Sequence, residues 1–474
     1  MLKPFSDPNK LRNLLEEHEW TLRSWSSSSL AAATSSCTDK EHRTPDSYDW
    51  LHYDYKMGGS TPDIPGVKLD GDLLRDFREE VRALLGRNSP GFPGAQPVSF
   101  AACHKLELQK KDYFVCEKSD GVRCLMYLTS NRNPVDHQEV TYLIDRKNDY
   151  YHVQRLHFPK SAENPLEFHE DTILDGELVN DTLPDGRIQL MYLVFDCLVL
   201  NRDPLMHLTL DKRIGRFRDI VYNPYRKLFF EDYPQEQEHQ EFLVDWKRME
   251  RSYGIEKMFR ETLPKLPHGN DGLVFTCRTT PYQFGTDQHI LKWKPAEENS
   301  IDFRMTLEFP TVEPDSDDED QSPYSDYGAI PEIKLAVYGG QDGYSTWGVM
   351  VVESRNWEAW KALQQPLNDR IVECSLIDSN RWRFLRFRDD KHEANHISTV
   401  QSVMESIEDK VSEDDLIRAS KAIRDEWKKR EREVEAQRAA MARAATNGQV
   451  RNGKTGLKRK HQGNDDAVNG GHGV

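Results

Sequence analysis

Short apolar runs separated by turns fill residues 60–300, and they constrain the fold more than any other feature of the sequence. The runs are rich in Val, Leu, Ile, Tyr and Phe and are bounded by Gly, Asp or Asn: YFVCEK, RCLMYL, VTYLIDR, TILDGELV, LMYLVFDCLVL and GLVFTC. Such runs are typical of β-strands. Helical periodicity interrupts them at residues 70–86 and 244–259. Because strands and helices do not alternate regularly, the pattern predicts an α+β domain with mainly antiparallel sheets over residues 57–300.

A second unit is predicted over residues 301–400. It holds the strand-like runs IDFRMTLEF, EIKLAVYGG, STWGVMVV, IVECSLI and RWRFLRFR, with few helices between them, which is typical of a small β-barrel. An acidic insertion, residues 313–327, separates the first two runs and is expected to be solvated.

Three further segments flank these units. Residues 411–445 read as one C-terminal helix, and Ser412 and Asp415 form a plausible capping pair at its start. The Gly/Asn-rich tail, residues 446–474, is expected to be disordered. Residues 1–56 contain a Ser/Ala-rich stretch and are interpreted as a low-complexity N-terminal extension.

Composition excludes some classes of function. The net charge of −16 disfavours a protein that coats nucleic acid over a broad surface, although a local basic groove can coexist with acidic tails. No run approaches the roughly 20 apolar residues of a membrane span, so no membrane association is expected. The 7 cysteines include no CxxC pair, which argues for a reducing compartment and against a zinc site or a disulfide framework.

Lys118 lies in the stretch EKSDGVRCLMYL, residues 117–128, at the tip of a predicted strand–turn–strand hairpin. Asp120 and Gly121 form the turn, and Arg123 follows it. A polar hairpin tip needs no special function. A lysine acts as a nucleophile only when it loses its proton, which nearby cations or burial favour. The nucleophile hypothesis therefore predicts that other basic residues converge on Lys118 and lower its pKa.

Basic residues suited to this role occur downstream. Lys292 and Lys294 lie on one face of a predicted strand, because side chains alternate along a strand, and Trp293 points the opposite way into a core. Arg386, Arg388 and Lys391 form a cluster that suits a polyphosphate, which Arg binds bidentately and Lys binds as a point charge.

Carboxylates precede two of the predicted strands. Asp175, Glu177 and Asp271 are oxygen ligands of the kind that Mg²⁺ prefers, or acceptors for a ribose hydroxyl. Taken one at a time, an Asp-Gly pair before a strand is usually only a turn.

The segment GQVRNGKT, residues 448–455, matches the P-loop pattern for phosphate binding. A working P-loop follows a buried strand and opens a helix. This segment follows a charged helix, so we expect no function from the match. The basic run Lys458–Lys460 is either a nuclear localisation signal or a solvated charge run.

The order of these motifs resembles that of the covalent nucleotidyltransferases, which include capping guanylyltransferases, ATP-dependent DNA ligases and RNA ligases. The matching stretches are Lys118-Ser-Asp-Gly-Val-Arg123, Asp145-Arg146, Asp175-Gly176-Glu177, Asp271-Gly-Leu-Val, Lys292-Trp293-Lys294 and Arg388-Asp389-Asp390-Lys391. KWKP and the R-x-D-K-x-x-x-N pattern ending at Asn395 look like messenger RNA capping guanylyltransferases. FPGAQPVSF, residues 92–100, is similar to fungal members. Ala394 departs from the pattern, since many members have Pro there.

The resemblance implies a nucleotidyltransferase domain followed by an OB-fold barrel and a two-step reaction. Lys118 attacks the α-phosphate of GTP, and the bound GMP then passes to the 5′-diphosphate end of nascent RNA. It implies a divalent metal, Mg²⁺ or Mn²⁺, with Asp271 and Glu177 as candidate ligands. The implied nucleotide-binding residues are Arg123, Arg146, Asp175, Gly176, Glu177, Lys292, Trp293, Lys294, Arg386, Phe387, Arg388, Asp389, Asp390 and Lys391.

The resemblance also implies partners and a nuclear location. No phosphatase loop of the H-C-x-x-G-x-x-R type is present, so the RNA 5′-triphosphatase is expected on a separate subunit. Docking on the phosphorylated C-terminal domain of RNA polymerase II is implied as well. Two alternatives are an ATP-dependent polynucleotide ligase, which shares the lysine chemistry, and a catalytically inactive scaffold.

Overall fold

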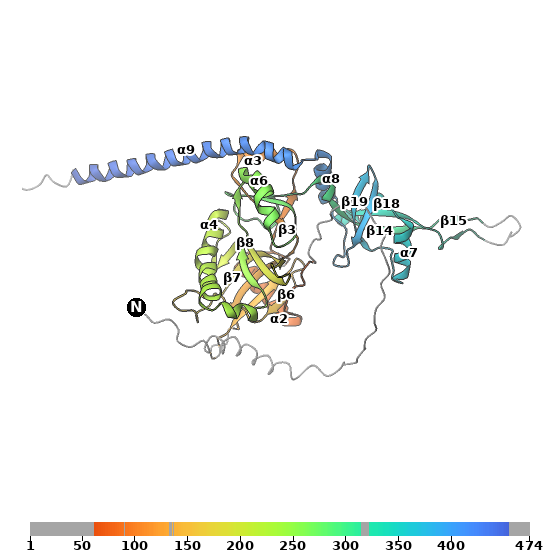
Figure 1. Cartoon of the computed structure of the whole chain (residues 1–474), viewed down its shortest axis with the longest axis horizontal. Coiled ribbons are helices and arrows are strands. Elements are labelled where there is room, and N and C mark those ends of the chain that lie inside the picture. Colours follow the sequence, from red (N-terminus) through yellow and green to blue (C-terminus); the bar gives the residue numbers. More distant parts are fainter. Residues whose placement is uncertain (1–60, 90, 132–134, 136, 314–321, 455–474) are drawn as a thin grey trace, which may run out of the picture.

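The computed structural model describes residues 61–454 except 90, 132–134, 136 and 314–321. The predicted extension, residues 1–56, and the centre of the acidic insertion therefore lie outside the described residues. Figure 1 shows a larger body of two sheets, a smaller barrel beside it, and a long helix that crosses back over the larger body.

The larger sheet has 8 strands in the order β1-β6-β5-β4-β7-β8-β10, with β9 paired to β8. All neighbouring strands are antiparallel except β10, which runs parallel to β8. The strands are β1 (Val67–Lys68), β4 (Val122–Ser130), β5 (Glu139–Ile144), β6 (Tyr150–Val153), β7 (Thr172–Thr182), β8 (Ile188–Leu200), β9 (Asp203–Pro204) and β10 (Leu243–Trp246).

Helices cover both faces of this sheet. α2 (Gly71–Leu84) packs through Val81 against Tyr127 and Tyr142. The opposite face packs on a helical stretch that includes α4 (Leu210–Arg216), α5 (Asn223–Arg226) and the π-helical segments Phe217–Tyr222 and Lys227–Asp232.

The second sheet has 5 strands in the order β11-β3-β12-β13-β2. They are β2 (Ala95–Ser99), β3 (Tyr113–Ser119), β11 (Glu250–Arg251), β12 (Asn270–Cys277) and β13 (Gly285–Trp293). One face of the sheet packs on α3 (His104–Lys110), α6 (Ile255–Lys257) and α9 (Glu413–Lys454), burying Leu416 and Ile423 of α9 in a shared apolar core.

The smaller body is a closed barrel in the order β14-β17-β18-β20-β19. Its strands are β14 (Ser300–Glu308), β17 (Glu332–Tyr338), β18 (Tyr344–Val351), β19 (Ile371–Asp378) and β20 (Arg381–Phe387), with α7 (Ser354–Ala362) between β18 and β19. The expectation of a small β-barrel is confirmed. Two short strands, β15 (Thr311–Val312) and β16 (Tyr324–Ser325), pair at the two ends of the acidic insertion. α8 (Ile397–Asp409) leads back to the larger body.

Of the two helices predicted within residues 57–300, the first is confirmed, and the second is not helical in its first half. The helix predicted over 70–86 is α2. The helix predicted over 244–259 begins as strand β10, because Leu243–Trp246 pairs in parallel register with Met191–Val194 of β8. Helical backbone starts only at Ser252. Tertiary pairing therefore overrides the local helical pattern here.

The predicted hairpin around Lys118 is also wrong. β3 and β4 follow one another in the chain but belong to different sheets and do not pair. The turn at Asp120 and Gly121 carries the chain from one sheet to the other, and the Asp120 amide donates to the carbonyl of Gly269 at 2.9 Å.

The C-terminal helix is confirmed but extends further than predicted. It begins with the expected cap, in which the Asp415 amide donates to Ser412 Oγ at 3.1 Å and the Ser412 amide donates to Asp415 Oδ2 at 3.0 Å. The helix ends at Lys454 rather than at Ala445, so the predicted disorder is wrong for residues 446–454. The P-loop-like segment therefore begins inside a helix and follows no strand.

No helix among the described residues is long and apolar enough to cross a bilayer.

Candidate active site

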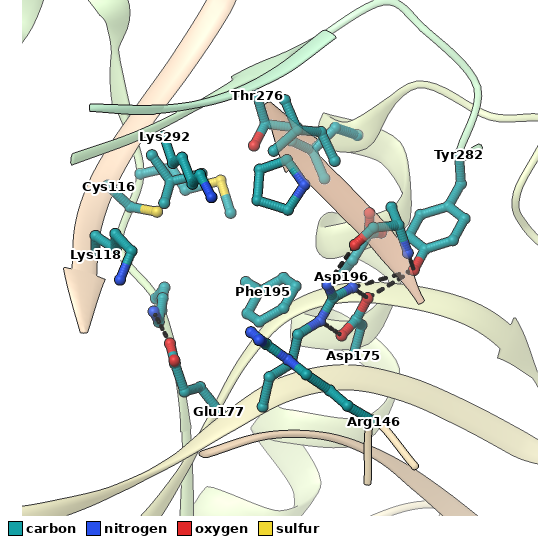
Figure 2. Close-up of a pocket in the computed structure, with 18 residues that line it drawn as sticks. Cys116, Lys118, Arg146, Asp175, Glu177, Phe195, Asp196, Thr276, Tyr282 and Lys292 are labelled. Carbon is teal, nitrogen blue, oxygen red and sulfur yellow. Dashed lines mark hydrogen bonds and ion pairs between the residues drawn. The ribbon is translucent and has the colours of Figure 1, made fainter. Parts of the chain in front are cut away.

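A solvent-open pocket of about 800 Å³ lies between the two sheets. Its walls come from both: the smaller sheet contributes residues such as Cys116, Lys118 and Lys292, and the larger sheet contributes Arg123, Asp175 and Glu177. Figure 2 shows Lys118 and Lys292 on one side of the pocket and Arg146 and Asp175 on the other.

Lys118 faces this pocket because side chains alternate along β3. Tyr113 and Val115 point into the core behind the sheet, and Cys116 and Lys118 point forward. Lys118 Nζ lies 2.7 and 3.0 Å from the two carboxylate oxygens of Asp271. Lys294 Nζ lies 2.6 Å from Asp271 Oδ2. One carboxylate thus holds two of the predicted lysines side by side.

A β-bulge places Asp271 opposite Lys118. Ser119 pairs with Asn270 and Glu117 pairs with Leu273, so Asp271 and Gly272 bulge out of the ladder between them. Gly272 has a φ of 142°, and a Cβ there would lie 2.0 Å from the carbonyl oxygen of Trp293. Only glycine fits this conformation and this close approach. The Asp-Gly pair is therefore a bulge that aims a carboxylate, not a simple turn.

Burial and neighbouring charges shift the pKa values of Asp271 and Lys292 in this pocket. Burial would raise the pKa of Asp271, but the neighbouring Lys118 and Lys294 lower it overall. Burial lowers the pKa of Lys292 to about 8, and the positive charges of Lys118, Lys294 and other cations add to the effect. The side chain of Lys292 makes no hydrogen bond or ion pair within the described residues, so no carboxylate offsets this lowering of its pKa.

Arg123 is clamped to the floor of the pocket. Its guanidinium donates to Asp175 from Nε at 3.0 Å and from Nη2 at 2.7 Å, and it also donates to the carbonyl of Ala95. Asp175 has no exposed surface and accepts a further hydrogen bond from the hydroxyl of Tyr282 at 2.7 Å. Asp175 is therefore a partner that orients Arg123 rather than a free ligand. Gly176 leaves room for Tyr192, whose ring would lie 2.5 Å from a Cβ there.

Glu177 is held by a residue that the sequence reasoning missed. Lys247 Nζ lies 2.7 Å from Glu177 Oε2. Burial would lower the Lys247 pKa, but Glu177 and Glu117 raise it overall. Lys247 follows strand β10, and its stretch was predicted to be helical, so no signal placed it in the pocket.

Phe195 is a second missed residue. Asp175 pairs with Asp196 and Gly176 pairs with Val194, so Phe195 is the extra residue of a bulge in β8. The bulge turns the aromatic ring into the pocket, where Figure 2 shows it near the centre. The sequence predicts the strand but gives no sign of the bulge.

Arg146 also lines the pocket, directly after β5, and is solvent-accessible. Its guanidinium makes no hydrogen bond or ion pair within the part of the chain that the structure describes. It is therefore available to an anion in the pocket.

The barrel cations are held by carboxylates of the barrel itself. Arg388 Nη1 lies 2.8 Å from Asp302 Oδ1, and Lys391 contacts the other oxygen of Asp302. Arg388 also binds Asp390 at 2.8 Å and holds the pKa of that carboxyl at about 2. The Asp302 amide donates to the Asn395 side chain at 2.9 Å. The R-x-D-K-x-x-x-N pattern thus converges on Asp302, which sequence reasoning missed.

The other predicted barrel residues have similar structural partners. Arg386 lies 2.7 Å from Glu373, and Asp389 lies 2.6 Å from Arg370. Phe387 packs on Trp360 and under the guanidinium of Arg370. None of these residues lines the pocket, but Lys391 lies close enough to contribute to the lowered pKa of Lys292.

Trp293 lies away from the pocket. It is 3% exposed and belongs to the core behind the smaller sheet, as its alternation with Lys292 and Lys294 predicts.

The carboxylates of the pocket do not form a ready metal site. No group of at least three His, Cys, Asp or Glu residues among the described residues could hold a metal ion. Asp271 is bound by two lysines and Glu177 by one. This donor set fits a metal ion that keeps few protein ligands and is held mainly by phosphate oxygens.

Comparison with known proteins decides the family. Residues 60–296 match the family described as "mRNA capping enzyme, catalytic domain", and residues 298–417 match "mRNA capping enzyme, C-terminal domain". The chain belongs to the mRNA capping enzyme family.

Curated relatives agree over most of the chain. The protein from Neurospora crassa named "mRNA-capping enzyme subunit alpha" is 52% identical over 378 residues, which are 77% of this chain and 93% of the relative. The protein of the same name from Schizosaccharomyces pombe is 46% identical over 370 residues, 78% of this chain and 90% of the relative. The protein of the same name from Saccharomyces cerevisiae is 39% identical over 391 residues, which are 75% of this chain and 84% of the relative.

Proposed function

We propose that this protein is an mRNA guanylyltransferase that transfers GMP from GTP to the 5′-diphosphate end of RNA through a lysyl-GMP intermediate on Lys118. The observation that carries the proposal is the convergence of Lys118, Lys292 and Arg146 on one pocket between two sheets, in a chain of the capping enzyme family. The alternative of an inactive scaffold does not account for a candidate nucleophile that shares one cavity with two cations whose side chains have no partner among the described residues.

The first step forms a phosphorus–nitrogen bond. The lone pair of Lys118 Nζ attacks the α-phosphorus of GTP, and the bond from that phosphorus to the bridging oxygen breaks. Pyrophosphate leaves with the electron pair, and the amine releases its protons to solvent through the open pocket. Before the attack, the Lys118 ammonium that pairs with Asp271 must lose a proton, because an ammonium has no lone pair.

The cations of the pocket stabilise the charge that develops on the phosphates. Lys292 and Lys294 flank the attacking amine, and Arg146 faces it across the pocket. Cations that are already in place lower the barrier without reorganising during the reaction. Phe195 offers an aromatic face against which the base stacks.

In the second step, a β-phosphate oxygen of the RNA attacks the α-phosphorus of the lysyl-GMP. The phosphorus–nitrogen bond breaks, and the Lys118 amine takes up a proton. The products are capped RNA and free enzyme.

A divalent metal, Mg²⁺ or Mn²⁺, fits this site as a companion of the nucleotide. Asp271 is the carboxylate beside Lys118, and Glu177 is the second candidate ligand. The metal would neutralise phosphate charge.

The barrel has the features of an OB-fold, and we include this assignment in the proposal. Its 5 strands close in the order first-second-third-fifth-fourth, with α7 between the third and fourth strands. Arg386, Arg388 and Lys391 on this barrel are assigned to the β- and γ-phosphates of GTP, after the barrel moves toward the pocket.

Partners and location complete the proposal. The relatives are named as an alpha subunit, which supports a heteromeric enzyme in which a second subunit carries the RNA 5′-triphosphatase. Binding to the phosphorylated C-terminal domain of RNA polymerase II and a nuclear location follow from a role in capping nascent transcripts.

Labelling with nucleotide tests the proposal. Purified protein is mixed with magnesium and either GTP or ATP labelled at the α-phosphate, then denatured. We expect label on the protein from GTP alone and none in Lys118→Ala. Label from ATP alone would make the protein a ligase-type enzyme, and no label from either would support the scaffold.

A further inference from the structure

Trp293 separates the two lysines of the KWK motif and anchors the strand that carries them. Its ring is 3% exposed and meets the ring of Phe259 edge-on, with 5.3 Å between centroids. A buried indole N–H costs free energy unless it finds an acceptor. The N–H of Trp293 donates to the carbonyl of Val411 at 2.8 Å.

Val411 marks the point where the chain returns from the barrel. The chain leaves the larger body at Lys294 and Pro295 and enters the barrel at β14. It comes back through α8, which ends at Asp409 and is followed by Lys410 in a left-handed backbone conformation, φ 46° and ψ 44°. Val411 follows and is 5% exposed. The Trp293–Val411 hydrogen bond therefore fastens the outgoing and returning crossings to each other, one residue away from Lys294.

A second contact fixes the returning crossing on its other side. The carboxylate of Asp409 accepts a hydrogen bond from the backbone amide of Ala102, just after β2 of the smaller sheet. The residues on both sides of Lys410 are thus attached to the larger body.

α9 begins here and packs against the face of the 5-stranded sheet that points away from the pocket. In β3, β12 and β13, Val115, Leu273 and Leu291 share a buried core with Leu416 and Ile423 of α9. Their neighbours in the same strands line the pocket, among them Lys118, Thr276 and Lys292. Figure 1 shows α9 crossing the larger body beside α3 and α6. Displacing the start of α9 would therefore shift the strands that carry the lysines.

We propose that Trp293 is a positioning residue for the guanylyl transfer, and this inference rests on the proposed function. Its indole N–H fastens the returning chain to the strand of Lys292 and Lys294, so that these amines keep their place when the barrel moves. A barrel that pivots at these crossings would otherwise pull on Lys294 directly. Because Trp293 contacts no nucleotide, its effect falls on the rate of the chemical step rather than on nucleotide affinity.

The test compares Trp293→Phe with Ile423→Val in the full-length chain. Phenylalanine keeps an aromatic ring against Phe259 and removes the N–H donor. Ile423→Val removes one methylene from the same core, on α9, without touching a polar group. Three quantities are measured for both variants and the wild type: the single-turnover rate of GMP attachment at saturating GTP, the Kd of GTP, and the thermal midpoint.

For Trp293→Phe we expect the rate of GMP attachment to fall by about tenfold to hundredfold, since a small misplacement of reacting groups has effects of this size. The Kd of GTP stays within about threefold, since the substitution removes no group that lines the pocket. Ile423→Val lowers the thermal midpoint and leaves the rate at the wild-type value.

Two results would overturn the inference. Wild-type rates in Trp293→Phe would show that the hydrogen bond has no role in positioning. An equal loss of rate in Ile423→Val would show that any loosening of this core slows the reaction. A wild-type protein that takes no label would overturn the proposed function itself, and this inference with it.

Discussion

Two cations of the pocket and the cations of the barrel are in opposite states. In the pocket, the side chains of Lys292 and Arg146 have no hydrogen-bond or ion-pair partner within the described residues, and they line open space. On the barrel, Arg388 and Lys391 share the carboxylate of Asp302, and Arg386 is paired with Glu373.

This difference indicates two roles in phosphate binding. Unpaired cations in a pocket carry a cost in stability and are ready for an anion without rearrangement. Cations that already have partners must exchange them, which makes them suited to act only when the barrel closes. We therefore assign the pocket cations to both GTP binding and GMP attachment, and the barrel cations to GMP attachment alone.

Among variants that keep Lys118, the largest effect is expected from Lys292→Met. Losing this amine removes a cation beside the attacking group, so the rate of GMP attachment falls by about 10²–10³, the usual range for a lost electrostatic contact in a transition state. The Kd of GTP rises as well. Single-turnover labelling over a range of GTP concentrations separates the rate from the Kd. An unchanged Kd would show that Lys292 does not contribute to GTP binding and would contradict the different roles assigned to pocket and barrel.

Lys391→Ala is expected to act differently. The rate of GMP attachment falls by about 10², while the Kd of GTP changes by less than about threefold, because the barrel contributes only after binding. The same labelling series measures both. A rise in Kd equal to that of Lys292→Met would mean that both groups bind the nucleotide together from the start.

Lys292→Met is also expected to stabilise the empty protein at pH 7. A lysine pKa lowered from 10.5 to about 8 corresponds to a cost of about 3 kcal/mol, of which we expect about 1–3 kcal/mol to be recovered. Below pH 8 both the folded and the unfolded lysine are protonated, and the full cost is present. Between pH 8 and 10.5 the unfolded state binds more protons, so wild-type stability rises with pH.

Urea unfolding of the wild type and Lys292→Met at pH 7 and pH 10.5 measures this effect. The difference in free energy of unfolding between the two proteins should shrink toward zero at the higher pH. A wild type that is the more stable protein at pH 7 would show that Lys292 has a partner the structure does not contain.

Tyr282→Phe is expected to have a modest effect. It removes the hydroxyl that joins Asp175 to the backbone amide of Ala95, at 2.7 and 2.8 Å, and so loosens the clamp on Arg123. We expect a loss of about 1–2 kcal/mol in unfolding free energy and a rise of a few fold in the Kd of GTP. Denaturant unfolding and equilibrium GTP binding check this, and an unchanged Kd would remove Arg123 from nucleotide binding.

The smallest effect is expected from ending the chain after Ala445. The P-loop-like segment begins inside α9 and follows no strand, so labelling should stay within about twofold of the full-length protein. A loss of labelling would give the segment a role that its context does not support.

The sequence predicts which residues meet but not how they are held. Lys118, Lys292 and Lys294 were expected together because their motifs occur in a recognised order and alternate along strands. The structure brings Lys118 and Lys294 to the carboxylate of Asp271, and Lys292 lines the same pocket as Lys118. Asp302 and Lys247 were missed because contacts between residues distant in sequence place them. Asp302 forms an ion pair with Arg388, which follows β20. Lys247 reaches the pocket because the strand before it, β10, pairs in parallel with β8.

β-Bulges account for most of the remaining differences between the sequence predictions and the structure. Phe195 enters the pocket and Asp271 reaches Lys118 because one extra residue interrupts each ladder. An interruption of this kind leaves no clear mark in the hydrophobic pattern. The assignment of Lys118 to a hairpin failed for a related reason, since a short turn does not reveal whether its two strands pair or enter separate sheets.

Mapping the site of GMP attachment tests the central claim most directly. Protein incubated with GTP and magnesium is digested under mildly alkaline conditions, which preserve a phosphoramidate, and its peptides are analysed by mass spectrometry. We predict that GMP is on Lys118 alone. GMP on Lys292, the lysine whose pKa is lowered to about 8, would contradict the account and make Lys292 the nucleophile.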